Sequence, residues 1–269
     1  MQTNHYESIK VIDHHFKKIT DRLVIEAPLQ ININGEAYTV VMRTPNDDLE
    51  LIRGLLYAED IYKRNEEIVF EITEKKEDFS TIINACIPPD KIGKGYLNKR
   101  TLLSVSSCGI CGKKELKDLA VSGDKIKTAI RFYPNEIKQM YEKMNKLQKT
   151  FHSSGGSHAA SLFNKKQELL TIKEDIGRHN AVDKTIGDLL LKNQLKQASY
   201  LLVSGRVSYE IISKAFIAKI PVIVAVSACS SLAVDFAKEF GICLIGFSRE
   251  NKMTIYSHPT LLKSDKIEA

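Results

Sequence analysis

The chain has no long apolar segment of the kind that membrane and exported proteins carry. No stretch approaches the roughly 18 consecutive apolar residues that a membrane-spanning helix needs. Residues 1–15, MQTNHYESIKVIDHH, contain no apolar run resembling that of a signal peptide. We therefore expect a cytoplasmic protein that is not associated with a membrane.

Cysteine is scarce and odd in number, with 5 cysteines in 269 residues. In a chain without an export signal this argues against a disulfide framework, so we expect mostly reduced thiols. The sequence has one C-x-x-C pair, Cys108 and Cys111, whereas a structural zinc site needs a second pair of ligands. The remaining candidates, among them Cys86 and His179, have no characteristic spacing. A zinc site is weakened but stays open.

Clustered positive charge is also lacking. The formal net charge of +6 favours anionic partners modestly. The basic residues are scattered, however, and no Arg/Lys tract with interleaved aromatic residues occurs, which argues against nucleic acid as a partner. A phosphorylated small molecule fits the charge equally well.

The chain is long enough for one large domain or two lobes, and its 43% hydrophobic content is that of a globular protein. We predict a polar, loosely held leader over 1–20, a strand-rich N-terminal lobe over 21–134 and a C-terminal α/β lobe over 135–269. In the first lobe, extended runs flank a hairpin turn at Asn34-Gly35, a helix follows 46–48, and strands are predicted at 67–73, 81–87 and 101–107. A helix over 135–149 opens the second lobe.

Alternating strands and helices make up the rest of the C-terminal lobe. Its apolar strand runs, LLV and VIVAV, indicate parallel strands that are buried on both faces of a layered sheet. The fold class predicted from the pattern is therefore α/β.

The first motif whose side chains could carry out a reaction is the segment Cys108-Gly-Ile-Cys-Gly112. Two thiols three positions apart can bind one metal ion, exchange a disulfide or carry a sulfur atom, and the glycines let the loop approach a large ligand. Two lysines and a predicted helix start follow, and both favour thiolate over thiol. A zinc deaminase motif is missing, because Ser107 and not proline precedes Cys108. Spacing alone leaves zinc, redox and sulfur transfer open.

The second motif, FHSSGGSH over 151–158, combines two glycines with hydroxyls and two histidines. A tight turn between a helix and a strand explains the glycines, whereas close approach of a ligand also explains the histidines. Both interpretations stay open.

The third motif, EDIGRHNAVDK over 174–184, lies at a predicted strand-to-helix junction. On that helix His179 and Asp183 are four residues apart, so the carboxylate could orient the imidazole and raise its pKa. We expect Arg178, Asn180 and Lys184 to supply donors that face an adjacent cavity. A solvated helix face would seldom gather so many polar residues at one junction, which favours a functional role.

Three polar turns each follow an apolar strand: Ser204-Gly205-Arg206, residues 227–231, and the segment from Phe247 to Lys252. Ligands of α/β sheets settle beyond the carboxyl ends of strands, where helix N-terminal amides attract phosphate. Arg206 could hold a phosphate by a bidentate contact. Plain helix capping, for example by Ser208, and a solvated hairpin are the simpler alternatives.

Taken together, these motifs resemble those of the FdhD family of formate dehydrogenase accessory proteins, which are described as sulfur carriers. The resemblance spans about residues 42–257 and rests on segments in the family's order: TPNDDLELIRGLLYAEDI, SSCGICGK, FHSSGGSHAA, EDIGRHNAVDKTIG, VSGRVSYEIISKA, PVIVAVSA and GFSREN. It implies a cytidine-deaminase-like core in the C-terminal lobe and a homodimer. It also implies binding of the molybdenum bis(molybdopterin guanine dinucleotide) cofactor, for which a guanine nucleotide could substitute.

Carried onto this chain, the resemblance makes Cys108 the persulfide cysteine, with Cys111 as its partner in the loop. The nucleotide-binding residues would be Phe247, Ser248, Arg249, Glu250, Asn251 and Lys252. The implied partners are a cysteine desulfurase as sulfur donor and formate dehydrogenase as client, and no metal ion is expected in the protein itself. Cys229 departs from the expected pattern and is interpreted as an incidental thiol. The roles of His158, His179 and Asp183 do not follow from the resemblance.

The resulting hypothesis is a sulfurtransferase that passes persulfide sulfur to the molybdenum cofactor before the cofactor enters formate dehydrogenase. The competing hypothesis is a chaperone that binds the cofactor without covalent chemistry.

Overall fold

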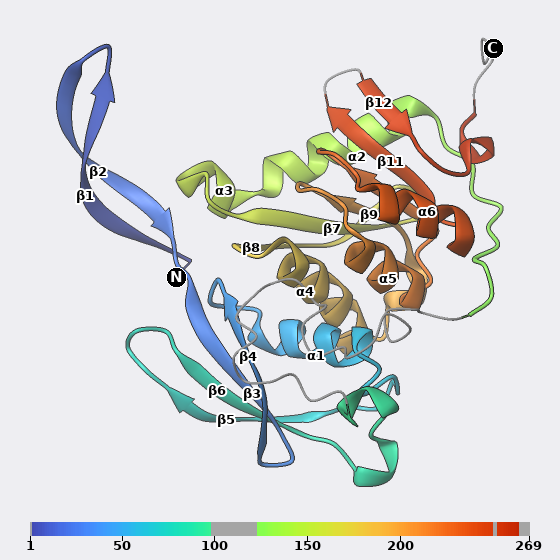
Figure 1. Cartoon of the computed structure of the whole chain (residues 1–269), viewed down its shortest axis with the longest axis horizontal. Helices are drawn as coiled ribbons and strands as arrows, with labels where there is room; N and C mark the ends of the chain where they lie inside the picture. The colour runs from blue at the N-terminus through green and yellow to red at the C-terminus, as the bar shows by residue number, and fades with distance from the viewer. Residues whose placement is uncertain (1, 98–122, 250–251, 264–269) are drawn as a thin grey trace.

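The computed structural model describes residues 2–97, 123–249 and 252–263 of the chain (Figure 1). The predicted strand over 101–107 and the CGICG segment lie outside these ranges. Within them, two sheets and the helices between them form the body, and a long hairpin projects from it. No helix of the described ranges is long and apolar enough to cross a membrane.

The N-terminal lobe is a four-stranded sheet in the order β4-β3-β6-β5 with helix α1 on one face. Its elements are β3 (Ala27–Ile33), β4 (Glu36–Arg43), α1 (Asp48–Ala58), β5 (Val69–Lys75) and β6 (Thr81–Cys86). Asn34 and Gly35 connect β3 to β4 with φ angles of 52° and 85°, the left-handed conformation that the Asn-Gly pair predicts. The apolar face of α1 and the inward residues of β3 and β6 form one buried cluster.

The C-terminal lobe contains a six-stranded sheet in the order β12-β11-β10-β9-β7-β8. Strands β9, β10 and β11 are parallel, as their continuous apolar runs predict, so the α/β class is confirmed. The elements in chain order are α2 (Pro134–Leu147), α3 (Lys149–Ser154), β7 (His158–Asn164), β8 (Leu169–Asp175), α4 (Arg178–Leu191), β9 (Ala198–Val203), α5 (Tyr209–Ile217), β10 (Val222–Ala225), α6 (Ser231–Phe240), β11 (Cys243–Arg249) and β12 (Lys252–Ile255).

Two buried clusters cover the two faces of this sheet. Helices α4, α5 and α6 pack on one face, and α2 packs on the other through Ile137, Met140 and Met144. Because both faces are covered, the sheet edge formed by the carboxyl ends of β9, β10 and β11 is where polar side chains can reach solvent. The lobe is therefore a layered α/β unit with its polar edge beyond these strands.

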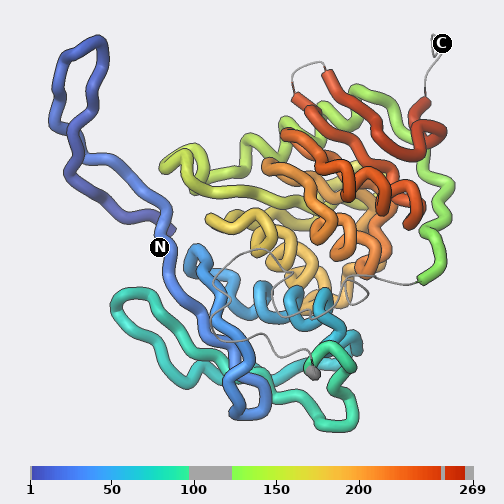
Figure 2. The backbone as a smooth tube through the Cα atoms, in the orientation of Figure 1, coloured from blue at the N-terminus to red at the C-terminus, as the bar shows by residue number. Residues whose placement is uncertain are grey.

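The two lobes meet where α1 crosses α4, side by side in Figures 1 and 2. A Cβ atom on Gly54 would lie 2.0 Å from the carbonyl oxygen of Asp183, and one on Gly187 would lie 1.8 Å from that of Glu50. Only glycine permits this approach, so backbone packs directly against backbone at the crossing.

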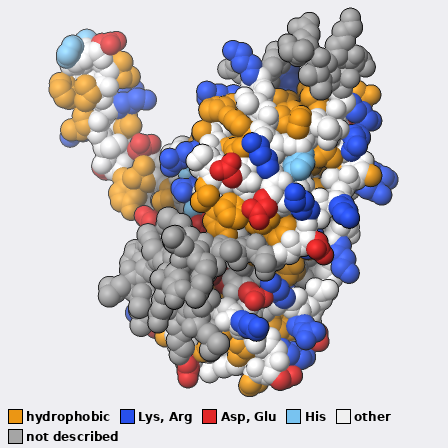
Figure 3. All heavy atoms as spheres, turned by 45° about the vertical axis from the view of Figure 1, so that its right-hand side comes forward, with side chains coloured by type: hydrophobic (Ala, Val, Ile, Leu, Met, Phe, Trp, Pro, Cys, Tyr) orange, Lys and Arg blue, Asp and Glu red, His pale blue; other side chains and the backbone are white. Residues whose placement is uncertain are grey.

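The polar leader forms a two-stranded hairpin of β1 (Thr3–Ile12) and β2 (His15–Val24), which leaves the body and returns to it in Figure 2. Most of its side chains are exposed, including Ile9, Val11 and Phe16, the last at 77%. Figure 3 shows apolar side chains along this projecting arm. The base of the hairpin contacts α3.

Candidate functional site

The sheet topology brings the sequence motifs of the C-terminal lobe to one edge. Strands β9, β10 and β11 end there, while the antiparallel β7 begins there with His158. Strand β8 runs antiparallel to β7 and ends at the same edge with Asp175, directly before α4. The predicted meeting of the strand-end turns is therefore present in the structure.

Backbone hydrogen bonds tie the three polar turns together. Val207 pairs with the 227–231 turn, donating to the carbonyl of Ala228 and accepting from the amide of Ser230. The amide of Phe247 donates to the carbonyl of Ser227 at 3.0 Å. The turns after β9, β10 and β11 thus form one continuous polar surface.

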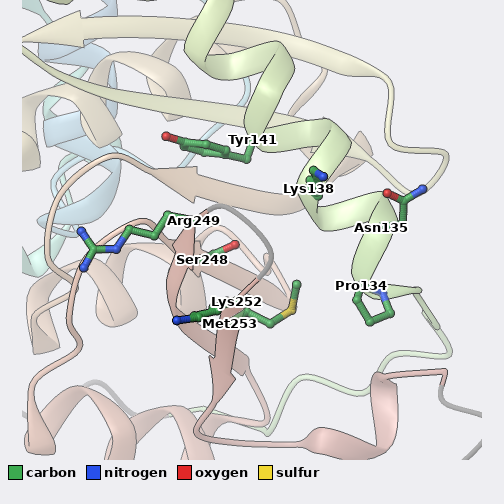
Figure 4. Close-up of a pocket in the computed structure, with 8 residues that line it drawn as sticks. All are labelled: Pro134, Asn135, Lys138, Tyr141, Ser248, Arg249, Lys252 and Met253. Atoms are coloured by element: carbon green, nitrogen blue, oxygen red, sulfur yellow. The ribbon is translucent and has the colours of Figure 1, made fainter.

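A cavity of about 240 Å³ lies between α2 and the β11–β12 pair (Figure 4). Tyr141 of α2 forms one wall, and Arg249 and Lys252 lie opposite it. In Figure 4 the tyrosine hydroxyl, the guanidinium and the ammonium group end on the same side of the site. A cavity of this size accommodates a base or a sugar and not a complete dinucleotide.

The β11–β12 connection explains how these side chains reach the cavity. The register of the two strands shifts between Gly246 and Arg249, and Phe247 there has a φ angle of 50°. Such a bulge re-aims side chains at a sheet edge. Phe247 is 40% exposed, whereas Ser248 is buried and lines the cavity. Glu250 and Asn251 lie outside the described ranges.

A second cavity of about 260 Å³ shares Tyr141 with the first. It lies against the FHSSGGSH motif and the turn after β9, and its lining includes His158 and Ser204. The Ser204 hydroxyl accepts a hydrogen bond from the amide of Ala159 at 2.9 Å, which leaves its own proton as a donor. Gly205 and Arg206 follow in the same turn, the latter exposed.

The pKa of His158 is lowered by burial first, and then by the charges of Arg178 and Arg206, against an opposing effect of Asp175. A Cβ atom on Gly205 would lie 3.2 Å from His158 Nδ1 and 3.6 Å from the Cβ of Arg178, so these residues are immediate neighbours. The edge therefore combines an imidazole of lowered pKa with two guanidinium groups, an environment that suits an anionic ligand.

His179 and Asp183 are buried, with 4% and 3% exposure. The Nε2 atom of His179 lies 3.1 Å from the Ser208 hydroxyl and 3.3 Å from a carboxylate oxygen of Glu210. Asp183 accepts two hydrogen bonds from Lys214 Nζ, at 2.7 and 2.9 Å. Ser208 starts α5 without a side-chain capping bond, because its hydroxyl faces the imidazole.

Sequence spacing thus identified two buried polar residues but missed Glu210 and Lys214, which come from a different helix. Burial alone would lower the pKa of Lys214, yet the carboxylates of Asp183 and Glu210 raise it overall. The i, i+4 spacing of Glu210 and Lys214 on α5 was the only available signal.

The expectation that Asn180 and Lys184 face a cavity is wrong. Lys184 is fully buried and binds Asp175 at 2.8 Å and the carbonyl of Thr44 at 2.8 Å. Asn180 donates to Asp175 and to the carbonyl of Met42. These side chains fasten the end of β4 to the junction of β8 and α4, so three of the seven polar residues in EDIGRHNAVDK serve the fold here.

Glu174 in the same motif also has a structural role. Its carboxylate accepts hydrogen bonds from the backbone amides of Thr150 and Phe151, at the start of α3. A carboxylate at this position satisfies amides that have no partner within the helix and complements the helix dipole. It holds the FHSSGGSH segment against β8.

Cys108 and Cys111 lie outside the described residues. Burial raises the pKa of Cys229 and of Cys243 to about 12, so neither is a reactive thiolate near neutral pH. Within the described ranges, no group of three or more Cys, His, Asp or Glu side chains is arranged to hold a metal ion.

Comparison with known proteins decides the family. The model of the FdhD/NarQ family matches residues 24–263, almost the whole chain. The chain belongs to the FdhD/NarQ family. The sequence-based recognition is thereby confirmed.

Similar curated members are named sulfur carrier protein FdhD. The protein from Picrophilus torridus is 40% identical over 255 residues, 93% of this chain and 95% of its own. That from Saccharolobus solfataricus is 38% identical over 96% of this chain and 97% of its own. The protein from Mycobacterium tuberculosis is 39% identical over 88% of this chain and 90% of its own.

A solved structure agrees in fold. The crystal structure of a protein from Desulfotalea psychrophila, assigned as a formate dehydrogenase accessory protein, superposes with a TM-score of 0.75. It covers 98% of this chain and 100% of its own at 23% identity, which supports the family's architecture.

Proposed function

We propose that this FdhD/NarQ family member is a sulfur carrier that forms a persulfide on Cys108. The observation that carries the proposal is the CGICG pair in a chain 38–40% identical, over nearly its full length, to proteins named sulfur carriers. Burial raises the pKa of Cys229 and Cys243 to about 12, and burial together with Glu71 raises the pKa of Cys86, so the C-x-x-C pair is the better candidate for the nucleophile.

In the first step, the thiolate of Cys108 attacks the outer sulfur of a persulfide on a cysteine desulfurase. The sulfur–sulfur bond of the desulfurase breaks, its cysteine thiolate leaves, and Cys108 carries the persulfide. One sulfur–sulfur bond is exchanged for another, so no oxidant is needed.

In the second step, Cys111 attacks the inner sulfur of the Cys108 persulfide. A Cys108–Cys111 disulfide forms and hydrosulfide leaves, ready to become a ligand of molybdenum in the cofactor. A dithiol reductant then restores both thiols. Sulfide release thus draws its two electrons from the cysteine pair, which accounts for the second cysteine.

The substrate in this proposal is the molybdenum bis(molybdopterin guanine dinucleotide) cofactor, and formate dehydrogenase is the client that receives it. The cavity between Tyr141, Arg249 and Lys252 supports this choice, because an aromatic wall suits a base and the two cations suit phosphate. Its volume of about 240 Å³ suits the guanine base of such a ligand.

Mass spectrometry after incubation with a cysteine desulfurase and cysteine tests the carrier role. We expect the mass of one additional sulfur atom on the peptide that contains Cys108. Cys108→Ala should abolish this gain, and Cys229→Ala, which removes a partly buried thiol of high pKa, is the matched control and should retain it.

A cofactor chaperone without covalent chemistry is the alternative. It predicts that no sulfur is gained and that formate dehydrogenase matures normally with the Cys108→Ala protein. That pair of results would exclude the carrier.

A further inference from the structure

The hairpin of β1 and β2, here called the arm, lies outside the hydrophobic clusters of both lobes (Figure 1). Its strands are ten residues long and pair with each other, and among the described strands no other pairs with either of them. A two-stranded hairpin alone is at best marginally stable in water, and an unpaired strand edge is a template for a further strand. We therefore expect the arm to be stabilised by a strand from another polypeptide.

The outer half of the arm has one apolar face. In the register of the two strands Val11 lies opposite Phe16, and Ile9 lies two residues before Val11 on the same face. All three side chains are more than half exposed. Apolar side chains gathered on one exposed face mark a site of interaction rather than a solvated surface.

The outer half of the arm is also basic. Lys10 lies directly opposite Lys17, and like charges in this position destabilise a strand pair. Lys18 follows on the same strand, and all three lysines are exposed. Within the described ranges none of them forms an ion pair with a carboxylate. Carboxylates from a partner would offset this repulsion, so the charge favours an acidic partner.

We propose that the outer half of the arm, residues 9–18, is a docking edge for an extended segment of another protein in which acidic and apolar residues alternate. The segment adds to the free edge of β2 through backbone hydrogen bonds. Successive side chains of a strand point to opposite faces. The added strand therefore places its apolar residues beside Phe16 and its carboxylates beside Lys17.

The base of the arm connects this docking edge to the C-terminal lobe. The hydroxyl of Thr150 in α3 donates to the side-chain oxygen of Gln2 at 2.6 Å. A Cβ atom on Gly156 of the FHSSGGSH motif would lie 2.8 Å from the side chain of Val24. A protein held by the arm is thereby tethered next to the polar edge of the sheet.

Fluorescence anisotropy of a labelled peptide, EVEVEVEVEV, with the full chain tests the docking edge. We expect saturable binding that weakens as the salt concentration rises. The combined change Lys17→Glu and Lys18→Glu should weaken binding by about 10-fold or more, because two attractive contacts become repulsive. Phe16→Ser should weaken it by about 10-fold through the loss of the apolar contact.

Two peptides and one variant are matched controls. The peptide EEEEEVVVVV has the same composition without the alternation, and KVKVKVKVKV has the alternation with the opposite charge; both should bind weakly. Lys165→Glu with Lys166→Glu changes another pair of adjacent exposed lysines, in the turn between β7 and β8, and should leave the affinity unchanged. All the substituted side chains are exposed, so every variant should unfold at the wild-type temperature.

Failure of the alternating peptide to bind, equal binding of either control peptide, or unchanged affinity after Lys17→Glu and Lys18→Glu would overturn the docking edge. A dimer in light scattering that Phe16→Ser dissociates would also overturn it, because a second copy of this chain would then occupy the arm. None of these measurements involves sulfur. A chain that binds the peptide but gains no sulfur contradicts the carrier function alone, and the reverse result contradicts only the docking edge.

Discussion

The buried pair of Lys184 and Asp175 offers the sharpest test of how the lobes are held together. Both side chains are 0% exposed, and their nitrogen and oxygen atoms are 2.8 Å apart. Lys184→Met keeps most of the side-chain volume but leaves the Asp175 carboxylate buried without its cation. Breaking such a pair costs about 3–5 kcal/mol.

We expect the lower end of this range, about 3 kcal/mol, because neutral donors still reach Asp175. They are the amides of Thr44 and Gly177 and the side chain of Asn180, at 3.1, 2.8 and 2.9 Å. For a chain of this size, that loss should lower the melting temperature by about 6–12 °C. Thermal unfolding followed by circular dichroism measures it.

Lys192→Met is the matched control, because Lys192 pairs with Asp188 at the same distance of 2.8 Å but is 53% exposed. Asp188 is itself only 6% exposed but keeps Lys173 at 3.6 Å, so the loss of the exposed Lys192 should cost about 1 kcal/mol or less. Adding Asp175→Asn to Lys184→Met should recover part of the loss, since the uncompensated charge is removed. If Lys184→Met is no more destabilising than Lys192→Met, the reasoning is refuted.

Two further predictions concern the helix crossing and the thiols. Gly187→Ala should destabilise the protein by about 3 kcal/mol or more, because the new methyl group would lie 1.8 Å from the carbonyl oxygen of Glu50; an unchanged urea midpoint would contradict this. Burial raises the pKa of Cys229 and of Cys243 to about 12, so at pH 8 only about 1 in 10,000 of each side chain is thiolate. Both cysteines should therefore resist iodoacetamide in the native protein. They should react once guanidinium unfolds the chain. Peptide mass spectrometry gives the answer, and fast labelling of Cys243 in the native protein would show that the burial argument is wrong.

Helices, strands and turns could be predicted from the sequence where the local hydrophobic pattern matches the burial of the residues. The strands LLV and VIVAV are apolar throughout because both faces of the sheet are covered, and the Asn34-Gly35 turn follows from backbone preference alone. The buried surface of α1 does not follow from spacing alone. Helical spacing groups Leu49 with Ile52 and Leu56 on one apolar face, yet Leu49 is 36% exposed. Leu51 is fully buried instead, because contacts on two sides widen the buried surface of this helix.

The roles of polar residues were harder to predict, because they depend on contacts that are distant in sequence. Lys184 was expected to face a cavity, but its partner Thr44 lies in the other lobe, and no local pattern reveals such a pairing. Tyr141 showed only the spacing of a core helix residue, yet it separates two cavities. The meeting of the three strand-end turns, in contrast, was predictable, since parallel strands end at one edge.

The glycine contacts between α1 and α4 limit how this molecule can respond to a ligand. Shear motions need a layer of side chains that can change rotamers as one helix slides along another. At Gly54 and Gly187 no such layer exists, and a shift of one residue along α1 would drive Arg53 or Leu55 into the backbone of the opposite helix. The two lobes should therefore tumble and respond as one rigid body, with the mechanical stiffness of a single domain despite their two separate cores.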